Sequence, residues 1–306
     1  MDLKSKRILV TGGAGFLGGH VVKALSAYGV PRQNIAIPRS RNCDLRIWEN
    51  CKKAVEGIDL VIHLAAITGD PKFHRQAPGR IFYDNLIMGT QLMEAARQTG
   101  VEKFVNIGSV AEYPADAPLP YKEEDLWRGL PEKIHLPYAL AKKSLLIQAQ
   151  AYSDQYDFRG THLLIANMYG EGAVEGVIPS LIRRILKAKK KNEISIEAWG
   201  TGKPSRDFLY VGDAAEGIIL ATVKYDKADP VNLGSAREVT IRDLVEFICH
   251  LVDYRGEIKW DTSKPDGRPR SILDISRAER EFDFKPKTSL EEGLRKTIEW
   301  YNNQLV

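Results

Sequence analysis

The glycine-rich stretch near the N-terminus constrains the fold of this chain more than any other segment. A short apolar run, Ile8–Val10, predicts a β-strand, and the amphipathic run His20–Leu25 predicts a helix soon after it. Between them, Gly12, Gly15 and Gly18 form a G-x-x-G-x-x-G pattern. Glycines in such a turn allow a tight bend, a close approach of the backbone to a pyrophosphate, and close packing of the helix on the strand.

This turn predicts a dinucleotide-binding unit and not a P-loop, because no Gly-Lys-Ser/Thr sequence closes it. The N–H groups of the first helical turn, at the positive end of the helix dipole, would face the phosphates. We therefore expect five residues of the turn to bind a cofactor: Gly12, Gly15, Phe16, Leu17 and Gly18. The alternative is an ordinary strand-to-helix turn.

Length and composition are compatible with one large α/β domain and a smaller one. The chain has 306 residues, of which 43% are hydrophobic and 27% charged, and a net charge of +4, as in ordinary soluble proteins. The basic run Lys187–Lys191 fits a solvated helix end better than a nucleic-acid surface. The 3 cysteines lack metal-ligand spacing and a disulfide framework, so we expect no metal and a reducing, cytoplasmic compartment. We expect neither a signal peptide nor a membrane span.

The second expected strand, Asn34–Pro38, is followed by Arg39-Ser-Arg41. Folds that prefer NAD usually carry an acidic residue here, which binds the ribose 2′-hydroxyl. The guanidinium of Arg39 can instead bind a 2′-phosphate, which favours NADP(H). NAD remains the alternative, with Asp44 as the acid. Otherwise we expect Asp44 and Leu45 to form a turn that touches the adenine.

The third expected strand, Ile58–Ala66, is almost continuously apolar, as in a parallel strand that is covered on both faces. Its last residues, Leu64, Ala65 and Ala66, leave space for a flat cofactor. We interpret His63, within the strand, as a core histidine and not as a catalyst.

The segment Thr68–Gly79 is expected to be a loop at the carboxyl end of this strand, where such sheets bind ligands. His74 and Arg75 are therefore candidate substrate contacts. A helix over Asn85–Gln98 and a strand over Lys103–Ile107 follow, and then a loop that contains Ser109.

A helix that begins at Leu136 and runs toward Tyr152 places Tyr138 and Lys142 on one face, because they are four residues apart. A neighbouring ammonium favours the phenolate and lowers the pKa of a tyrosine, which makes a general acid/base usable near neutral pH. Ser109, at the end of a neighbouring strand, can bind the same substrate oxygen. The alternative is a pair of side chains on a surface helix.

Taken together, the motifs resemble those of the extended short-chain dehydrogenase/reductase superfamily, which acts largely on nucleotide sugars. They are TGGAGFLG, HLAA, Ser109, Tyr138-xxx-Lys142 and Asn167-Met-Tyr-Gly170. The resemblance implies that Ser109, Tyr138 and Lys142 form a catalytic triad, with Lys142 also holding the nicotinamide ribose. It implies that Asn85 and Asn167 serve as scaffold, cofactor and substrate contacts, and that the chain forms a homodimer.

The resemblance also implies a Rossmann-like, doubly wound parallel sheet with a smaller C-terminal α/β substrate lobe. The expected division is a cofactor domain over residues 1–168 with 208–236 returning to it, and a lobe formed by 169–207 and 237–306. Within the returning part we expect a strand, Phe208–Val211, and a helix, Ala214–Val223. Two amphipathic helices, Thr240–Val252 and Ser289–Tyr301, are expected in the lobe.

Three later segments are similar to those of GDP-L-fucose synthases: Val177–Arg184, Trp199–Tyr210 and Asp261–Gly267. In that family the arginine of the second segment, here Arg206, faces the substrate diphosphate. Two cations on one turn, Lys203 and Arg206, suit a pyrophosphate. The alternative is a surface loop with an Arg206–Asp207 salt bridge. The expected substrate-binding residues are Asn167, Val177, Arg184, Trp199, Lys203, Arg206 and Asp266.

Two positions depart from this family. Its epimerisation of C3 and C5 uses a cysteine and a histidine, where this chain has Ala111 and Gly176, and neither can move a proton. His74 and His135 are near the expected site and could substitute. Ala111 also stands where 4,6-dehydratases carry a glutamate. Glu112 is one residue further, and in a strand-like segment it would point the other way.

These observations predict an NADP(H)-dependent reductase of the C4 ketone of a nucleotide-activated sugar, with GDP as the favoured nucleotide and without 3,5-epimerase activity. One alternative is a 4-epimerase of UDP-sugars with tightly bound NAD. Another is a non-catalytic dinucleotide-sensing or scaffold protein, although such proteins commonly lose the tyrosine or the lysine. The expected partner is a nucleotide sugar, with no nucleic acid and no membrane.

Overall fold

A six-stranded parallel sheet forms the centre of the larger part of the molecule, in a computed structural model that describes residues 1–304. Its strand order is β2-β1-β3-β4-β5-β9. The strands are β1 (Ile8–Thr11), β2 (Ile35–Ala36), β3 (Leu60–His63), β4 (Lys103–Ser109), β5 (Gly160–Ile165) and β9 (Val231–Leu233). The direction of winding reverses between β1 and β3, and sheets of this kind bind ligands at that point, beyond the carboxyl ends of the strands.

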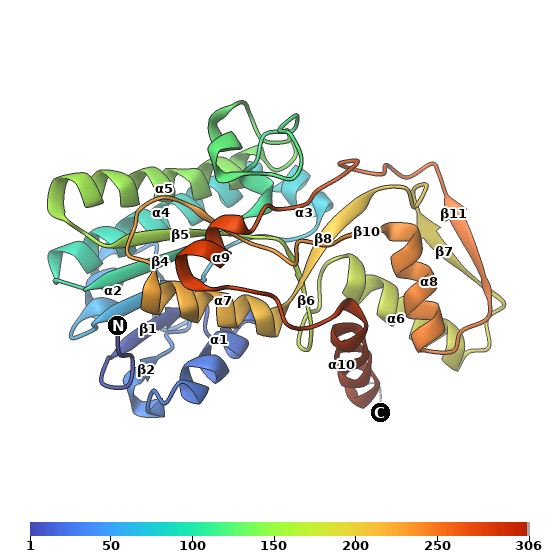
Figure 1. Cartoon of the computed structure of the whole chain (residues 1–306), viewed down its shortest axis with the longest axis horizontal. Helices are drawn as coiled ribbons and strands as arrows, with labels where there is room; N and C mark the ends of the chain where they lie inside the picture. The colour runs from blue at the N-terminus through green and yellow to red at the C-terminus, as the bar shows by residue number, and fades with distance from the viewer. Residues whose placement is uncertain (305–306) are drawn as a thin grey trace.

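Helices cover both faces of this sheet (Figure 1). One face carries α1 (Phe16–Ala27), α7 (Val211–Lys224) and α9 (Ser276–Phe282), and the other carries α2 (Trp48–Val55), α4 (Pro78–Gln98) and α5 (Leu136–Tyr156). Every residue of β1 and β3 is buried, as predicted from their apolar runs, and so is every residue of β5. Each face has its own apolar cluster. The predicted doubly wound α/β architecture is therefore confirmed.

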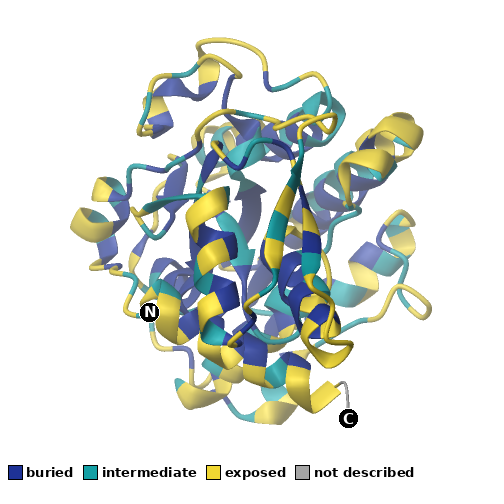
Figure 2. Cartoon of the chain, turned by 90° about the vertical axis from the view of Figure 1, so that its right-hand side faces the viewer, coloured by how far each residue is buried: buried dark blue, intermediate teal, exposed yellow. Residues whose placement is uncertain are grey.

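The smaller part contains two further sheets and a separate apolar cluster. Three strands run in the order β10-β8-β6, and two parallel strands, β7 and β11, form the second sheet. The bounds are β6 (Asn167–Tyr169), β7 (Ser195–Trp199), β8 (Ser205–Tyr210), β10 (Glu238–Thr240), β11 (Glu257–Asp261), α6 (Val177–Lys190), α8 (Ile241–Leu251) and α10 (Leu290–Gln304). Figure 2 faces this part and shows buried stripes along strands and helices whose outer sides are exposed.

Two elements differ from the sequence-based expectations. The strand expected at Phe208–Val211 is β8, and it pairs with β6 and β10 instead of joining the large sheet. Helix α7 and strand β9, which follow it, do reach the larger part. The loop expected at Thr68–Gly79 contains a helix, α3 (Pro71–Gln76), because the Asp70 side chain accepts a hydrogen bond from Phe73 N and caps it.

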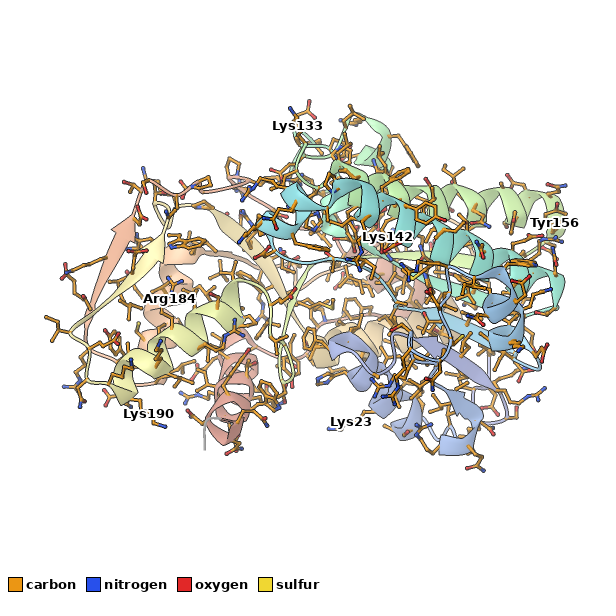
Figure 3. The ribbon with its side chains drawn as sticks, turned by 180° about the vertical axis from the view of Figure 1, so that it is seen from behind. Lys23, Lys133, Lys142, Tyr156, Arg184 and Lys190 are labelled. Atoms are coloured by element: carbon orange, nitrogen blue, oxygen red, sulfur yellow. The ribbon has the colours of Figure 1, made fainter. Side chains whose placement is uncertain are left out.

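The remaining short elements are 3₁₀ turns: η1 (Arg32–Asn34), η2 (Val110–Glu112) and η3 (Glu123–Trp127). The basic run Lys187–Lys191 forms the end of α6, as predicted, and Figure 3 labels Lys190 there. Within residues 1–304, no helix is both long and apolar enough to cross a bilayer. The same residues contain no group of three or more His, Cys, Asp or Glu side chains placed to bind a metal ion.

Candidate active site

In the turn between β1 and α1, backbone atoms of the glycines lie in close contact with other backbone atoms. Gly12 has a φ of +67°, and a Cβ there would lie 2.9 Å from the amide nitrogen of Ala65, just beyond β3. A Cβ on Gly18 would lie 2.1 Å from the carbonyl oxygen of Gly12. Gly15 begins α1 without any side-chain cap. The turn therefore brings the start of α1 to the point where the winding of the sheet reverses, a cradle that fits a dinucleotide pyrophosphate.

A buried histidine lies beside this cradle. His63 Nδ1 is 2.8 Å from Thr11 Oγ1, which connects the ends of β3 and β1. Burial, and then the nearby Lys142 ammonium, lower the pKa of His63 to about 3. His63 is thus a neutral core histidine, as predicted. Its proximity to Lys142 places that lysine above the same edge of the sheet.

The segment after β2 contains the residues that were expected to distinguish NADP from NAD. Arg39 is exposed and forms no ion pair within the described chain. The Asp44 carboxylate lies 2.7 Å from Arg46 Nη2, and hydrogen bonds from Arg46 lower the pKa of Asp44. Arg46 also lies 3.3 Å from Asp84, an arrangement that no sequence motif indicated. Asp44 is therefore already paired, while Arg39 is available to an anion, and Leu45 is buried beneath them.

Asn85 has a structural role in this region. It is buried, and its amide binds the backbone of Ile67 on both sides, through N–H at 2.9 Å and C=O at 2.7 Å. It also donates to Ile81 O. These hydrogen bonds give Asn85 a scaffold role that fastens the segment after β3, while its expected cofactor contact stays a prediction. The neighbouring Leu64, Ala65 and Ala66 are half-buried and face the end of the sheet near Gly12.

The predicted triad residues come from two elements that pack together, η2 and α5. Ser109 ends β4 and is the N-cap of η2, and Tyr138 and Lys142 lie in the first two turns of α5. Figure 3 labels Lys142 inside the larger part of the molecule, where its side chain is 2% exposed. Burial lowers the pKa of Lys142 to about 8, and the Glu112 carboxylate opposes that shift.

The expectation of a lowered phenol pKa at Tyr138 is wrong. Burial, followed by the charge of Glu112, raises the pKa of Tyr138. The sequence placed the ammonium beside the phenol but did not reveal a carboxylate behind it. Across residues 1–304, the Tyr138 hydroxyl and the Lys142 ammonium have no hydrogen-bond partner, so both remain available to a ligand.

Two histidines lie next to the phenol ring. The His74 ring is 4.8 Å from that of His135 and 5.8 Å from that of Tyr138, both edge to face. His74 comes from α3 and His135 directly precedes α5. Burial lowers the pKa of both imidazoles. The structure therefore brings together two neutral bases and the phenol, whereas Arg75 is exposed on α3.

Glu112 and Ala111 lie in a 3₁₀ turn and not in the strand-like segment that was expected. Glu112 is fully buried, while Ala111 is half-buried. The Ala111 side chain has no proton to exchange, and Gly176, before α6, has no side chain. Neither residue therefore has a side-chain group that can exchange a proton with a substrate.

Arg206 provides an unpaired cation on β8 in the smaller part. It is half-buried, donates to Ser205 O at 2.8 Å, and forms no ion pair among the described residues. The alternative of a salt bridge to Asp207 is wrong, because that carboxylate accepts from the amide and hydroxyl of Ser235 at 2.8 and 2.6 Å. Burial lowers the pKa of Arg206, which is the behaviour of a guanidinium that lacks its counter-ion.

Other expected substrate residues lie in the turn before β8 and on α6. Asp266 accepts two hydrogen bonds from Thr201, so it braces the turn that presents the exposed Lys203. On α6, Arg184 lies over the ring of Trp199 at 6.0 Å, and Figure 3 labels Arg184 in the smaller part.

The last two expected substrate residues lie in β6 and at the start of α6. Asn167 donates to Asp207 O at 3.4 Å, and Val177 is exposed at the first position of α6. Neither position conflicts with a substrate contact.

Sequence reasoning missed a second half-buried guanidinium. Arg268 donates to the hydroxyl of Tyr121 at 2.8 Å and to the backbone of Tyr113, and it lies 3.6 Å from Glu132. Arg268 and Glu132 both influence the pKa of Arg206, so this cluster adjoins the cation of β8. The residues are far apart in the chain, and no motif links them.

Comparisons with known proteins agree with this geometry. The profile of the NAD dependent epimerase/dehydratase family matches residues 8–234. A GDP-L-fucose synthase from Sinorhizobium fredii is 34% identical over 304 residues, which are 97% of this chain and 96% of that protein. The structure is similar to a GDP-mannoheptose C4 reductase from Campylobacter jejuni with NADP bound, at a TM-score of 0.90 and 26% identity, covering 98% and 99% of the two chains. It is also similar to a UDP-glucose 4-epimerase from Thermotoga maritima, at 0.85 and 28%, covering 98% and 99%.

Proposed function

We propose that this chain, which belongs to the NAD-dependent epimerase/dehydratase family, reduces the C4 ketone of a GDP-linked 4-keto sugar and leaves C3 and C5 unchanged. It is an NAD(P)-dependent nucleotide-sugar enzyme, and it uses NADP. Relatives named GDP-L-fucose synthase and GDP-mannoheptose C4 reductase support the nucleotide and the reaction class. We also propose that the chain is divided into a cofactor domain and a substrate lobe. We further propose that it forms a homodimer and is located in the cytoplasm.

The observation that carries this proposal is the pair of unpartnered donors, Tyr138 and Lys142, beside the glycine cradle. NADPH held there would supply hydride to C4, and the carbonyl electron pair would move to the oxygen. Tyr138, which its raised pKa keeps protonated at neutral pH, donates the phenolic proton to that oxygen. The Ser109 hydroxyl donates a hydrogen bond to the same atom, and the Lys142 ammonium binds the nicotinamide ribose.

The substrate end of the proposal depends on Arg206. A half-buried guanidinium without a counter-ion offers donors to both phosphates of a nucleoside diphosphate, and Lys203 adds a second charge from the adjoining turn. Arg39, exposed and unpaired at the end of β2, would receive the 2′-phosphate of NADP.

The test is to incubate the purified protein with NADPH and a GDP-4-keto-6-deoxy sugar in deuterated water. A reductase oxidises one equivalent of NADPH per sugar, and NMR of the product shows a new C4 hydroxyl and no deuterium at C3 or C5. A 4-epimerase would give no net oxidation of NADPH. The absence of NADPH oxidation with GDP-, UDP-, dTDP- and CDP-linked 4-keto sugars would refute the proposal.

One observation favours a second candidate function, epimerisation beside the ketone. His74 and His135 are neutral imidazoles in contact with each other, and His74 also contacts the Tyr138 ring. A C4 ketone acidifies the hydrogens at C3 and C5, which an imidazole can exchange. Deuterium at either carbon, lost in both His74→Gln and His135→Gln, would favour this second candidate over simple reduction.

A further inference from the structure

We propose that Glu112 is a positioning residue for the reaction: it fixes Ser109 and places a buried negative charge behind Tyr138 and Lys142. His162 and Asn106 in turn hold Glu112. The inference rests on the proposed reductase function, since its effect is exerted on the proton donor Tyr138, on Ser109, which hydrogen-bonds the same oxygen, and on Lys142, which binds the ribose.

One oxygen of Glu112 is used to orient Ser109. Glu112 Oε1 accepts a hydrogen bond from Ser109 N at 2.7 Å, and Ser109 Oγ accepts from Ala111 N at 3.2 Å. This reciprocal cap fixes both the backbone and the side chain of Ser109 at the end of β4. Because the Oγ atom accepts from the turn, its own hydrogen remains free to donate to a substrate oxygen.

The other oxygen is held from the neighbouring strand. His162 Nε2, on β5, is 3.0 Å from Glu112 Oε2, and His162 Nδ1 is 2.7 Å from Asn106 Nδ2, on β4. Since the amide group donates to Nδ1, the ring proton is on Nε2 and is donated to the carboxylate. All three side chains are completely buried. A Cβ on Gly108 would lie 2.3 Å from His162 Nε2, so only glycine leaves room for this arrangement.

The charge of Glu112 faces the helix that carries the tyrosine and the lysine. Glu112 raises the pKa of Tyr138 and of Lys142, in each case after burial, and it acts on Lys143 in the same direction. The Lys143 ammonium donates a hydrogen bond to Leu126 O at 2.5 Å and forms no ion pair with Glu112 among the described residues.

The other titratable groups packed around Tyr138 and Lys142 carry no negative charge. On the remaining sides they are three histidines, His63, His74 and His135, in all of which burial lowers the pKa. Tyr113, next to Glu112, is buried with a raised pKa. Among the residues that the structure describes, Glu112 is thus the one carboxylate that shifts both Tyr138 and Lys142.

Packing alone does not require a carboxylate at the position of Glu112. Burying an ionised group is unfavourable unless it is paired, and an apolar side chain of similar volume often serves stability as well or better. A fully buried glutamate that holds Ser109, has a dedicated donor, and acts by its charge on Tyr138 and Lys142 is therefore explained by the chemistry of those groups and not by packing.

The decisive variant is Glu112→Gln, which removes the charge and can keep the hydrogen bonds. The glutamine oxygen can accept from Ser109 N, and its amide group can donate to His162 if the imidazole adopts its other tautomer. Asn106 Oδ1, which has no partner in the structure, can then accept from His162 Nδ1 after a turn of the amide. We expect near-wild-type melting and NADPH affinity, with the alkaline limb of kcat/KM moved down by about one pH unit, since the pKa of Lys142, which burial lowers to about 8, loses the upward contribution of the Glu112 charge.

The matched control is His162→Gln, which keeps the carboxylate charge and offers it an amide donor. We expect its alkaline limb to stay in place while kcat falls several-fold, with KM and NADPH affinity unchanged. An alkaline limb of E112Q that coincides with that of the wild type overturns the proposal. So does an equal shift in both variants, or, if E112Q does not fold, an H162Q enzyme with unchanged kcat. A wild-type protein that oxidises no NADPH would instead refute the proposed function.

Discussion

Replacing Gly18 by alanine tests whether the contact between α1 and the glycine turn creates the cofactor site. The added methyl group would lie 2.1 Å from Gly12 O, 2.5 Å from Gly13 Cα and 2.8 Å from Gly12 C. All three are backbone atoms, so no flexible side chain can move aside. Ordinary contact begins at 3.4 Å, so the helix and the turn must separate by more than 1 Å.

The neighbouring residue supplies the control. A Cβ on Gly19, in the same helix, meets nothing within 4 Å. Alanine there should stabilise the protein by about 0.5–1 kcal/mol, because it forms helix more readily than glycine. The same gain applies at Gly18, but overpacking of about 1–3 kcal/mol opposes it, which leaves a net loss of about 0–2.5 kcal/mol.

The consequence for binding should be larger than the consequence for stability. The N–H groups of the first turn of α1 would move by more than 1 Å from the pyrophosphate, enough to lose hydrogen bonds worth about 1–3 kcal/mol, or about 5- to 150-fold in NADPH affinity. Urea unfolding and fluorescence titration with NADPH measure the two effects on wild type, Gly18→Ala and Gly19→Ala. If Gly18→Ala bound NADPH as tightly as Gly19→Ala does, the close contact would not define the site.

Three further predictions concern charges and protons. Tyr138→Phe should lower kcat at least about 100-fold at unchanged NADPH affinity, because it removes the proton donor; turnover within tenfold of wild type would contradict this role. Arg206→Met should raise KM for the GDP-sugar about tenfold or more and leave NADPH affinity unchanged; a loss confined to NADPH would contradict it. Burial lowers the pKa of Lys142 to about 8, so the unfolded chain binds more protons between that pH and 10.5, and stability rises with pH across the window. Lys142→Met should therefore be more stable at pH 7 by up to about 3 kcal/mol and lack that rise; parallel unfolding curves for the two proteins from pH 7 to 10 would refute the explanation.

Local patterns in the sequence predicted the first strand, the glycine turn and the helix with Tyr138 and Lys142, because each depends on neighbours within a few residues. The signal for α3 was also local: Asp70 followed by Pro71 is a helix start, which the interpretation of this segment as a loop overlooked. Membership of a sheet is different. The apolar pattern of β8 is the same whether it joins one sheet or another, so its pairing with β6 and β10 could not be inferred.

The electrostatic details depended on contacts between distant parts of the chain. The pKa of Tyr138 was misjudged because burial, followed by the charge of Glu112, raises it, and Lys142 does not lower it. Asp44 is paired with Arg46, and Arg206 is not paired with Asp207, although both pairs lie close in sequence. Only the positions of all the competing donors decide which neighbour a charged side chain binds.

The position of β9 beside β5 has a consequence for how the molecule is made. On the ribosome, the first 165 residues emerge before the chain has built β6, β7 and β8, and only then does Val231–Leu233 arrive to cover β5. Until that moment, β5 is an open edge, able to pair with a strand of another nascent chain. A truncation before residue 231 should accordingly aggregate, and the cofactor half cannot be excised as a self-sufficient piece.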